Sequence, residues 1–324
     1  MPRSRRRRRL LVGAVGMFVS FLCLWLVFEY VDLRQAGATL LATDGRWLLV
    51  AMAIFWIANA IRILRWRLLL AHVADLDVMQ VGEILILGYS MNCLLPARLG
   101  EPFRAEYAQR RFGVDRLAVF GSIVTERVLD GLFTATILIG GLALTSFGQR
   151  APGLSAFNSA AAIGLFVFVG AGGLILAARH LNLEKLPGPA WLSGIVGRLR
   201  AGAAMSSGPT LSLAFVCSAL IWGLEVLAFW ALLVSIGVDI TIANILVLFG
   251  AGSLSVLAPA APGQIGTLQL VFAVVMEAFA QPPASGVAAA TLVQTAFFGS
   301  WIVAAAAIVV VRSLVAMFGQ LRTD

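Results

Sequence analysis

The sequence predicts an all-α polytopic membrane protein, and its composition and apolar runs lead to this class. Of 324 residues, 60% are hydrophobic and only 12% are charged, whereas soluble domains average about 25% charged residues. A spanning helix needs roughly 20 apolar residues, and six runs approach or exceed this length. They are 10–28, 47–61, 117–147, 157–178, 211–236 and 287–311. The polar segments between them are too short to form a separate soluble domain.

Charge and cysteine usage exclude several other classes. The formal net charge of +8 would suggest nucleic acid for a soluble protein, but basic residues sort topology in a membrane protein. We therefore expect no nucleic-acid partner. Cys23, Cys93 and Cys217 lie in apolar segments, where cysteine usually serves as a small packing residue. No metal, cofactor or catalytic constellation is predicted.

The N-terminal arginines 3 and 5–9 precede the first apolar run. This pattern fits an uncleaved signal anchor better than a cleaved signal peptide, because no small-residue cleavage site follows. The positive-inside rule then places the N-terminus in the cytoplasm. We expect the protein to reside in the inner membrane. Span 1 (10–29) leads outward and span 2 (47–64) returns.

The next apolar stretch, 78–96, is the first irregular element. If it crossed the membrane, five arginines between 98 and 116 would be exported, which violates the positive-inside rule. A re-entrant hairpin over 80–113 avoids the conflict, with one arm at 80–95, a turn at 96–102 and a second arm at 103–113. The alternative is that proline and glycine only kink ordinary spans.

The rest of the chain repeats this pattern. Span 3 (117–146), span 4 (157–178) and span 5 (211–236) follow the first hairpin. A second short and broken stretch, 242–280, predicts a hairpin that enters from the outer side. Span 6 (286–311) then returns the C-terminus to the cytoplasm.

The two breaks also resemble each other. EILILGYSMNCLLPARLGE (83–101) and LVLFGAGSLSVLAPAAPGQ (246–264) align without gaps, and 163 positions separate both Pro96 from Pro259 and Gly100 from Gly263. We predict two membrane repeats, 1–150 and 151–324, each with three spans and a hairpin. An odd number of spans inverts the second repeat, which is the arrangement of many transporters.

Span 3 carries Glu126, Arg127 and Asp130 near its middle. Each charge there costs about 2.5–3.5 kcal/mol on insertion scales, so these groups must face protein or water and pair with opposite charge. Glu126 and Asp130 share one helix face, and Arg127 points about 100° away. The cluster is either a structural ion network or part of a substrate or proton pathway.

The hairpins supply the predicted binding site. Arg98 and Arg104 flank a helix start at Gly100, Glu101 and Pro102, and free N–H groups at such a start favour anions. The second hairpin offers the uncharged residues Pro262, Gly263 and Gln264.

Two charged residues outside the hairpins and span 3 have open roles. Arg62, with the nearby Arg65 and Trp66, is either a phosphate contact or part of a snorkelling cytoplasmic belt. Glu225 either pairs with Arg127 or carries a proton. The candidate proton carriers are Glu101, Glu126, Asp130 and Glu225.

LLPARLGEPFRA (94–105), TERVLDG (125–131) and PAAPGQIGTLQ (259–269) resemble the transmembrane, flippase-like region of lysylphosphatidylglycerol synthases. The likeness covers nearly the whole chain. It implies lipid translocation, with a functional core of Arg98, Gly100, Glu101, Arg104, Glu126, Arg127 and Asp130. The third motif departs from the family pattern, since Ala-Pro-Gly-Gln stands where Pro-Gly-Gly with a later Glu is common. The aminoacyltransferase activity of the full-length synthases is not carried over.

The sequence thus favours a lipid flippase or scramblase for an anionic or phosphate-bearing lipid. No Walker pattern is present, so an ion or lipid gradient is the expected driving force. The alternatives are an intramembrane transferase for lipid-linked substrates and a non-catalytic partner of a lipid-biosynthesis enzyme. The oligomeric state stays open.

Overall fold

The computed structural model describes residues 3–95, 99–145, 208–255 and 261–320, and six isolated positions between 163 and 201. Within these ranges every regular element is a helix, which confirms the all-α class. Predicted span 4 (157–178), apart from positions 163 and 170, and the residues Pro96, Arg98 and Pro259 lie outside the described part of the chain.

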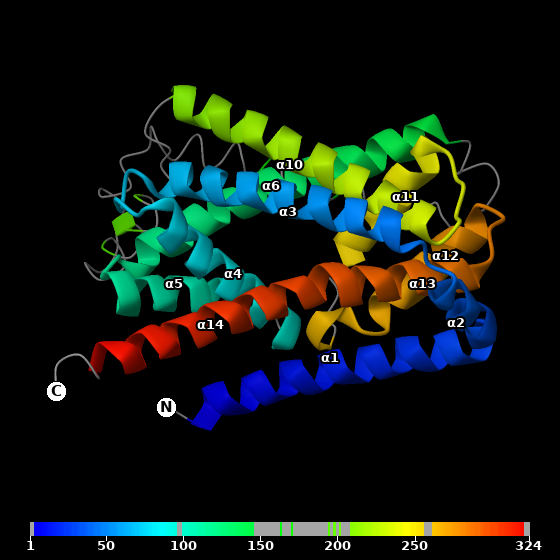
Figure 1. The fold of residues 1–324 in the computed structure, drawn as a ribbon, viewed down its shortest axis with the longest axis horizontal. Coiled ribbons are helices and arrows are strands. Elements are labelled where there is room, and N and C mark those ends of the chain that lie inside the picture. The colour runs from blue at the N-terminus through cyan, green and yellow to red at the C-terminus, as the bar shows by residue number, and fades with distance from the viewer. Residues whose placement is uncertain are drawn as a thin grey trace.

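Long helices follow the molecule's longest dimension (Figure 1). Helices α1 (Arg3–Tyr30), α3 (Gly45–Leu70), α6 (Arg116–Leu144) and α10 (Gly208–Ser235) correspond to predicted spans 1, 2, 3 and 5. Helix α1 begins seven residues before the predicted span, and α3 ends six residues after it. Helices α3, α6 and α10, together with Pro283–Val315, are long and apolar enough to cross a membrane. Large apolar side chains such as Phe18, Leu49 and Val303 are exposed, as expected for a surface in contact with lipid. The chain is therefore a multi-pass membrane protein.

Helices α4 (Val78–Leu94) and α5 (Gly100–Phe112) form an antiparallel pair. Asp77 starts α4 with a capping box to Gln80, which satisfies N–H groups that would otherwise be unpaired. Near the turn, the Gly100 N–H donates to the side-chain oxygen of Asn92 at 2.8 Å. The pair matches the predicted arms, with its second helix beginning three residues early.

A second antiparallel pair comprises α11 (Ile242–Ser255) and α12 (Thr267–Ala278), with a short 3₁₀ turn η4 (Pro262–Gln264) between them. The backbone at Gly263 and Gly266 has φ of 64° and 89°, a left-handed region that glycine adopts without strain. The η4 turn packs against α4. The broken ends of the two pairs therefore meet inside the molecule, as Figure 1 also shows.

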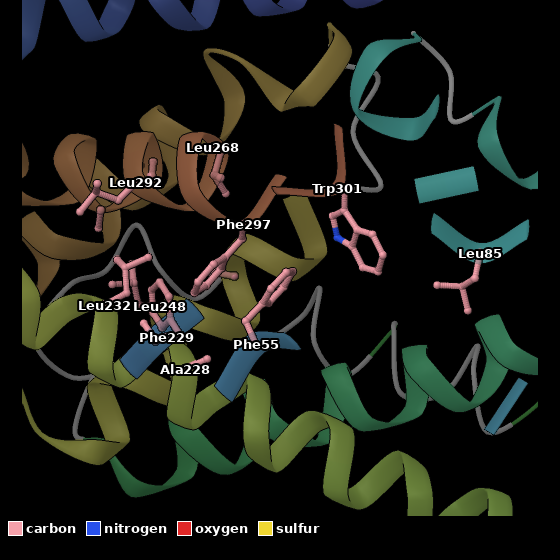
Figure 2. Close-up of a cluster of buried hydrophobic side chains, with 14 of the residues drawn as sticks. Phe55, Leu85, Ala228, Phe229, Leu232, Leu248, Leu268, Leu292, Phe297 and Trp301 are labelled. Atoms are coloured by element: carbon pink, nitrogen blue, oxygen red, sulfur yellow. The ribbon is translucent and has the colours of Figure 1, made fainter. Parts of the chain in front are cut away.

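Helices α3 and α10 pack along one another in opposite directions, with the Asp44 N–H bonded to the Ser235 carbonyl at one end. Fully buried Ala58 and Ala228 allow such close approach. Phe55 of α3 stacks on Phe297 at 4.4 Å between ring centroids. Phe55, Ala228 and Phe297 belong to the main apolar cluster of the molecule (Figure 2).

Two elements differ from the sequence prediction. The segment between spans 1 and 2 contains helix α2 (Leu33–Leu41), whose start is capped by Asp32, and it packs on α13. Predicted span 6 begins three residues early and is interrupted. It consists of α13 (Pro283–Leu292), a π-helical turn (Val293–Phe298) and α14 (Gly299–Gln320).

The far end of α14 is held against the first hairpin pair. Arg312 forms an ion pair with Glu83 of α4 at 2.5 Å and donates to the hydroxyl of Tyr107 of α5 at 2.8 Å. Tyr107 in turn donates to Glu83. This triad ties the C-terminal part of the chain to the N-terminal part, at the end of the molecule where α1 begins and α14 ends (Figure 1).

Candidate functional site: a cavity beside a buried ion network

One face of α3 carries Asn59, Arg62 and Arg65, spaced three residues apart. This spacing keeps side chains on the same side of a helix, and all three are buried. Arg65 is 0% exposed, so the interpretation of Arg62 and Arg65 as a snorkelling belt is wrong. Trp66, beside them, is also fully buried and donates its indole N–H to Ser122 at 3.2 Å.

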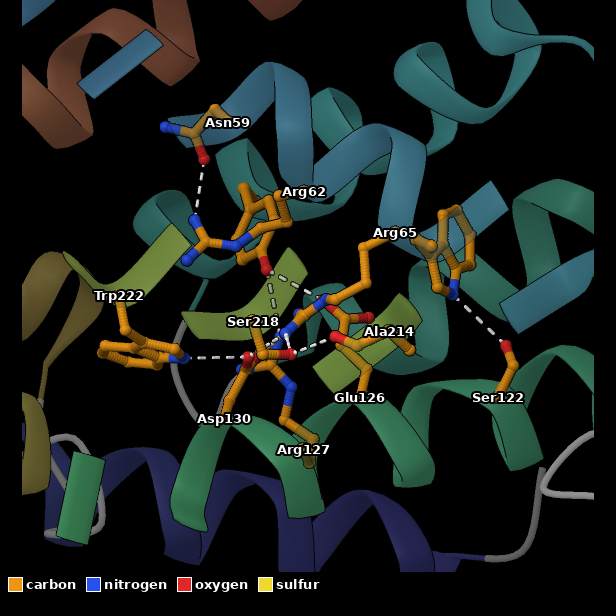
Figure 3. A network of polar contacts seen from close by, with 12 residues as sticks. Asn59, Arg62, Arg65, Ser122, Glu126, Arg127, Asp130, Ala214, Ser218 and Trp222 are labelled. Carbon is orange, nitrogen blue, oxygen red and sulfur yellow. Dashed lines mark hydrogen bonds and ion pairs between the residues drawn. The ribbon is translucent and has the colours of Figure 1, made fainter. Parts of the chain in front are cut away.

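Helix α6 presents its acids to this face. The Arg65 guanidinium donates to Asp130 at 2.7 Å and to Ser218 of α10 at 2.8 Å, and it lies 3.6 Å from Glu126. Arg127 bends back to within 3.3 Å of Glu126 and 3.7 Å of Asp130. The three charges of span 3 are therefore all compensated by ion pairs, as Figure 3 shows.

Arg104 reaches Glu126 from α5. It is 1% exposed, forms a 2.8 Å ion pair with Glu126, and its guanidinium lies 3.9 Å from the centre of the Trp66 ring. A desolvated cation over an aromatic face is stabilised by about 2 kcal/mol. Arg104, which the sequence analysis places beside the helix start at Gly100, thus also contacts a charge of span 3. Arg98 lies outside the described residues.

The close fit of Arg104 depends on Gly88 of α4. A Cβ built on Gly88 would overlap the Cγ and Cδ atoms of Arg104, whereas one on Gly140 of α6 would meet nothing within 4 Å. We expect Gly88→Ala to displace Arg104 from Glu126 and to lower the free energy of unfolding by about 1–3 kcal/mol. Gly140→Ala is the control and should leave the free energy of unfolding unchanged. Equal unfolding temperatures for both variants in detergent would contradict this packing.

Helix α10 adds Glu225, which accepts from Arg62 at 2.6 Å. The prediction that Glu225 pairs with Arg127 is wrong in this structure, because Arg62 of α3 lies directly opposite. Asn59 holds the other terminal nitrogen of Arg62 at 2.7 Å. Arg62 and Glu225 are 163 positions apart, which is also the offset between the two sequence breaks.

Together these residues form what we call the ion network: Arg62, Arg65, Arg104, Glu126, Arg127, Asp130 and Glu225. It contains four cations and three anions. Among the described residues, buried guanidinium nitrogens of all four arginines have no hydrogen-bond partner: Nε of each, and one terminal nitrogen of Arg65. Buried donors of this kind are normally satisfied, so the network has capacity for an additional acceptor.

A cavity of about 440 Å³ opens beside the network. Its polar wall is formed by Arg62, Tyr89, Arg127, Asp130, Glu225 and Gln264. Aromatic side chains form much of the remaining wall: Phe55, Trp222, Phe229, Phe249, Phe272, Phe297, Phe298 and Trp301. The cavity is therefore charged on one side and apolar on the other.

The second hairpin contributes Gln264 to this cavity. Ser255 donates to the Gln264 side chain at 3.0 Å, and the Gly263 carbonyl accepts from Gln294 at 2.9 Å. Gln294 also accepts from Gln269 at 2.6 Å. Pro262 and Gly263 shape the turn, and neither lines the cavity.

The start of α5 differs from the predicted anion site. Asn92 accepts from the Gly100 N–H and donates to Glu101 at 3.4 Å, so one of the N–H groups expected to be free already has a partner. Gly100 and Glu101 are not cavity residues. The helix start is held by a side chain of α4, which the sequence prediction did not include.

Several network partners were absent from the sequence prediction. Tyr89 of α4 donates to Glu126 and accepts from Arg127, both at 3.1 Å, and Trp222 donates to Asp130 at 3.3 Å. The spacing of Asn59, Arg62 and Arg65 was the available signal, since three polar residues on one face of a span are costly unless they are paired.

Fold and site together define a multi-pass α-helical membrane protein that encloses a charged cavity among its helices. The chain matches the family described as the lysylphosphatidylglycerol synthase TM region over residues 13–307, and it belongs to this family. The resemblance noted from the sequence motifs is confirmed.

Two curated relatives were found. Glycosyltransferase AglD of Haloferax volcanii is 26% identical over 90% of this chain and 52% of its own length. UPF0104 membrane protein MJ1595 of Methanocaldococcus jannaschii is 23% identical over 42% of each chain. The chain therefore spans about half the length of the curated relatives it matches.

Proposed function

We propose that the protein moves an anionic or phosphate-bearing lipid between membrane leaflets, as a flippase or scramblase. The observation that carries the proposal is the cavity, in which an ion network with one excess cation faces an aromatic wall. A charged head group resists leaving water for hydrocarbon. A polar cavity lowers this barrier, while the acyl chains remain in an apolar environment.

The residues have different proposed roles. Arg62 and Arg127 bind the head group, because both line the cavity, and Gln264 adds a neutral contact. Glu126 and Asp130 hold Arg127 in place, and Arg104 in turn pairs with Glu126. Asn59 and Glu225 hold Arg62. Asn92, Gly100 and Glu101 fix the turn between α4 and α5. Arg98 remains a proposed head-group contact on sequence grounds, with Pro262 and Gly263 shaping the opposite turn.

The proposed architecture is an inverted repeat of 1–150 and 151–324 with two re-entrant hairpins. Three helix contacts support it: α4 packs on α14, α11 packs on α6, and α3 packs on α10. The offset of 163 positions carries α4 onto α11, α6 onto the segment that runs from α13 into α14, and α3 onto its own partner α10. Residues at equivalent positions touch each other only near a symmetry axis, and Arg62 and Glu225 do so.

Both terminal helices have their free ends at the same end of the molecule (Figure 1). This supports our proposal that both termini lie on one side of the membrane. We further propose that this side is the cytoplasmic one and that the membrane is the inner membrane. The partner is a membrane lipid, and a lipid-biosynthesis enzyme is a further proposed partner.

The direct test is translocation of a fluorescent phosphatidylglycerol in proteoliposomes. Arg127→Gln leaves three cations against three anions in the network, so the excess positive charge is lost. We expect the translocation rate to fall by at least about tenfold. Folding should persist, since Glu126 keeps its ion pairs with Arg104 and Arg65.

The matched control is Arg110→Gln, which removes the same charge from an exposed position of α5 that is paired with Glu106. It should translocate at the wild-type rate. If Arg127→Gln matches this control, Arg127 does not bind the head group. If the wild-type protein shows no translocation of any anionic lipid, the transport assignment itself is wrong.

A transferase acting on lipid-linked substrates is the second candidate, favoured by the name of the relative AglD. The cavity holds two carboxylates, of Asp130 and Glu225, which could serve as an acid or a base. Both are engaged by arginines in the structure, so we prefer transport. Product formation by the purified protein with radiolabelled sugar or phosphate donors would reverse this preference.

A further inference from the structure

We propose that Glu225 is an internal counter-ion, which pairs with Arg62 when the cavity is empty and is displaced by an incoming head group. This inference rests on the proposed function and assigns Glu225 a specific part in it. It replaces the expectation that Glu225 is a proton carrier with a role in substrate exchange. The step is an exchange of one ion pair for another, in which no covalent bond forms or breaks.

The acids of the network are held very differently. Glu126 is 0% exposed and contacts three arginines and the Tyr89 hydroxyl. Asp130 contacts Arg65, Arg127 and Trp222. Glu225 has Arg62 as its ion-pair partner among the described residues, and its side chain is 14% exposed at the cavity. Glu225 is therefore the acid that can leave its partner at the lowest cost.

Arg62 is prepared for this exchange by Asn59. The asparagine oxygen accepts from one terminal nitrogen of Arg62, while Glu225 accepts from the other. Asn59 is itself fixed, because its amide donates to the Phe55 carbonyl at 2.8 Å. When Glu225 moves away, Arg62 stays in position with one terminal nitrogen and Nε available. A phosphate can accept from two nitrogens of one guanidinium.

The chemistry identifies the ligand class as a mono-anionic phosphate ester. The ion network has one excess cation with Glu225 in place, which matches one negative charge. Glu225 also limits the affinity, because its carboxylate competes for Arg62 and favours release of the head group. Since Arg62 and Glu225 come from α3 and α10, binding also removes a link between the two halves of the chain.

The test separates binding from turnover. In Glu225→Gln the competing charge is lost, so the protein should bind fluorescently labelled phosphatidylglycerol in detergent about tenfold more tightly. In proteoliposomes the same variant should show a lower KM and a lower maximal translocation rate, because release becomes slow. Glu225→Asp keeps the negative charge but is one methylene shorter, so its carboxylate competes less well for Arg62. Its affinity should lie between those of the wild type and Glu225→Gln.

The control is Glu277→Gln, which removes an acid at an exposed position of α12 that does not line the cavity. It should bind and translocate as the wild type does.

If Glu225→Gln binds more weakly and its rate falls in parallel, Glu225 is a structural or binding group and the inference is wrong. If Glu225→Gln fails to fold, Glu225→Asp decides. An affinity of Glu225→Asp at or above the wild-type value supports displacement, and a much lower one overturns it. If the wild type binds but does not translocate, the proposed function fails while the binding comparison still decides whether Glu225 competes.

Discussion

Replacing Glu126 with glutamine is expected to lower the free energy of unfolding by about 3–5 kcal/mol, because it leaves buried arginines without their carboxylate. Glu126 is 0% exposed and is the common partner of Arg104, Arg65 and Arg127. Glutamine has nearly the same shape, so packing is conserved and only the charge changes. The measurement is the unfolding transition of the purified protein in detergent.

Glu106→Gln is the matched control, since Glu106 forms exposed ion pairs with Arg110 and Arg116. Exposed pairs contribute little to stability, so its unfolding transition should coincide with that of the wild type. A small and equal effect of both substitutions would mean that Glu126 is not the centre of the network.

Filling the cavity should stop transport without touching the charges. Ser253 of α11 lines the cavity and is not part of the ion network. We expect Ser253→Trp to reduce translocation by at least about tenfold, because an indole occupies space that the head group needs. The unfolding temperature should stay near that of the wild type, since the new side chain points into open volume.

Ser313→Trp provides the comparison, because Ser313 of α14 is exposed and does not line the cavity. It introduces the same side chain on the outer surface and should leave translocation unchanged. Full activity of Ser253→Trp would show that lipid does not pass through this cavity.

The sequence predicted much of the helical architecture, because both apolar length and its interruptions are visible in it. Proline and glycine near Gly100 and Gly263 marked the two places where helix pairs turn. Helix α2 was missed although Asp32 caps its first turn, since nine residues are too few for an apolar run. The π-helical turn was also missed, because its local sequence does not differ from ordinary helix.

The site was predicted in part. The charged residues of span 3 predicted buried ion pairs, since charged residues in a span require partners. The choice among partners depends on how helices pack, and one sequence does not contain that information. Arg65 and Glu225 illustrate this. They lie on antiparallel helices, and only their packing sets Arg65 against Asp130 and Glu225 against Arg62. The cap that Asn92 provides to α5 arises from the same kind of tertiary contact.

The π-helical turn at Val293–Phe298 has a consequence for the chain beyond it. One extra residue in a turn rotates the following helix by about 100° relative to an uninterrupted one. With this rotation, Phe297 and Trp301 face the cavity while Arg312, further along, meets Glu83. Residues 283–320 thus form one continuous helix with two registers, one before and one after the π-helical turn. Deletion of one residue within the π-helical turn would rotate Trp301 and Arg312 together by about 100° relative to α13.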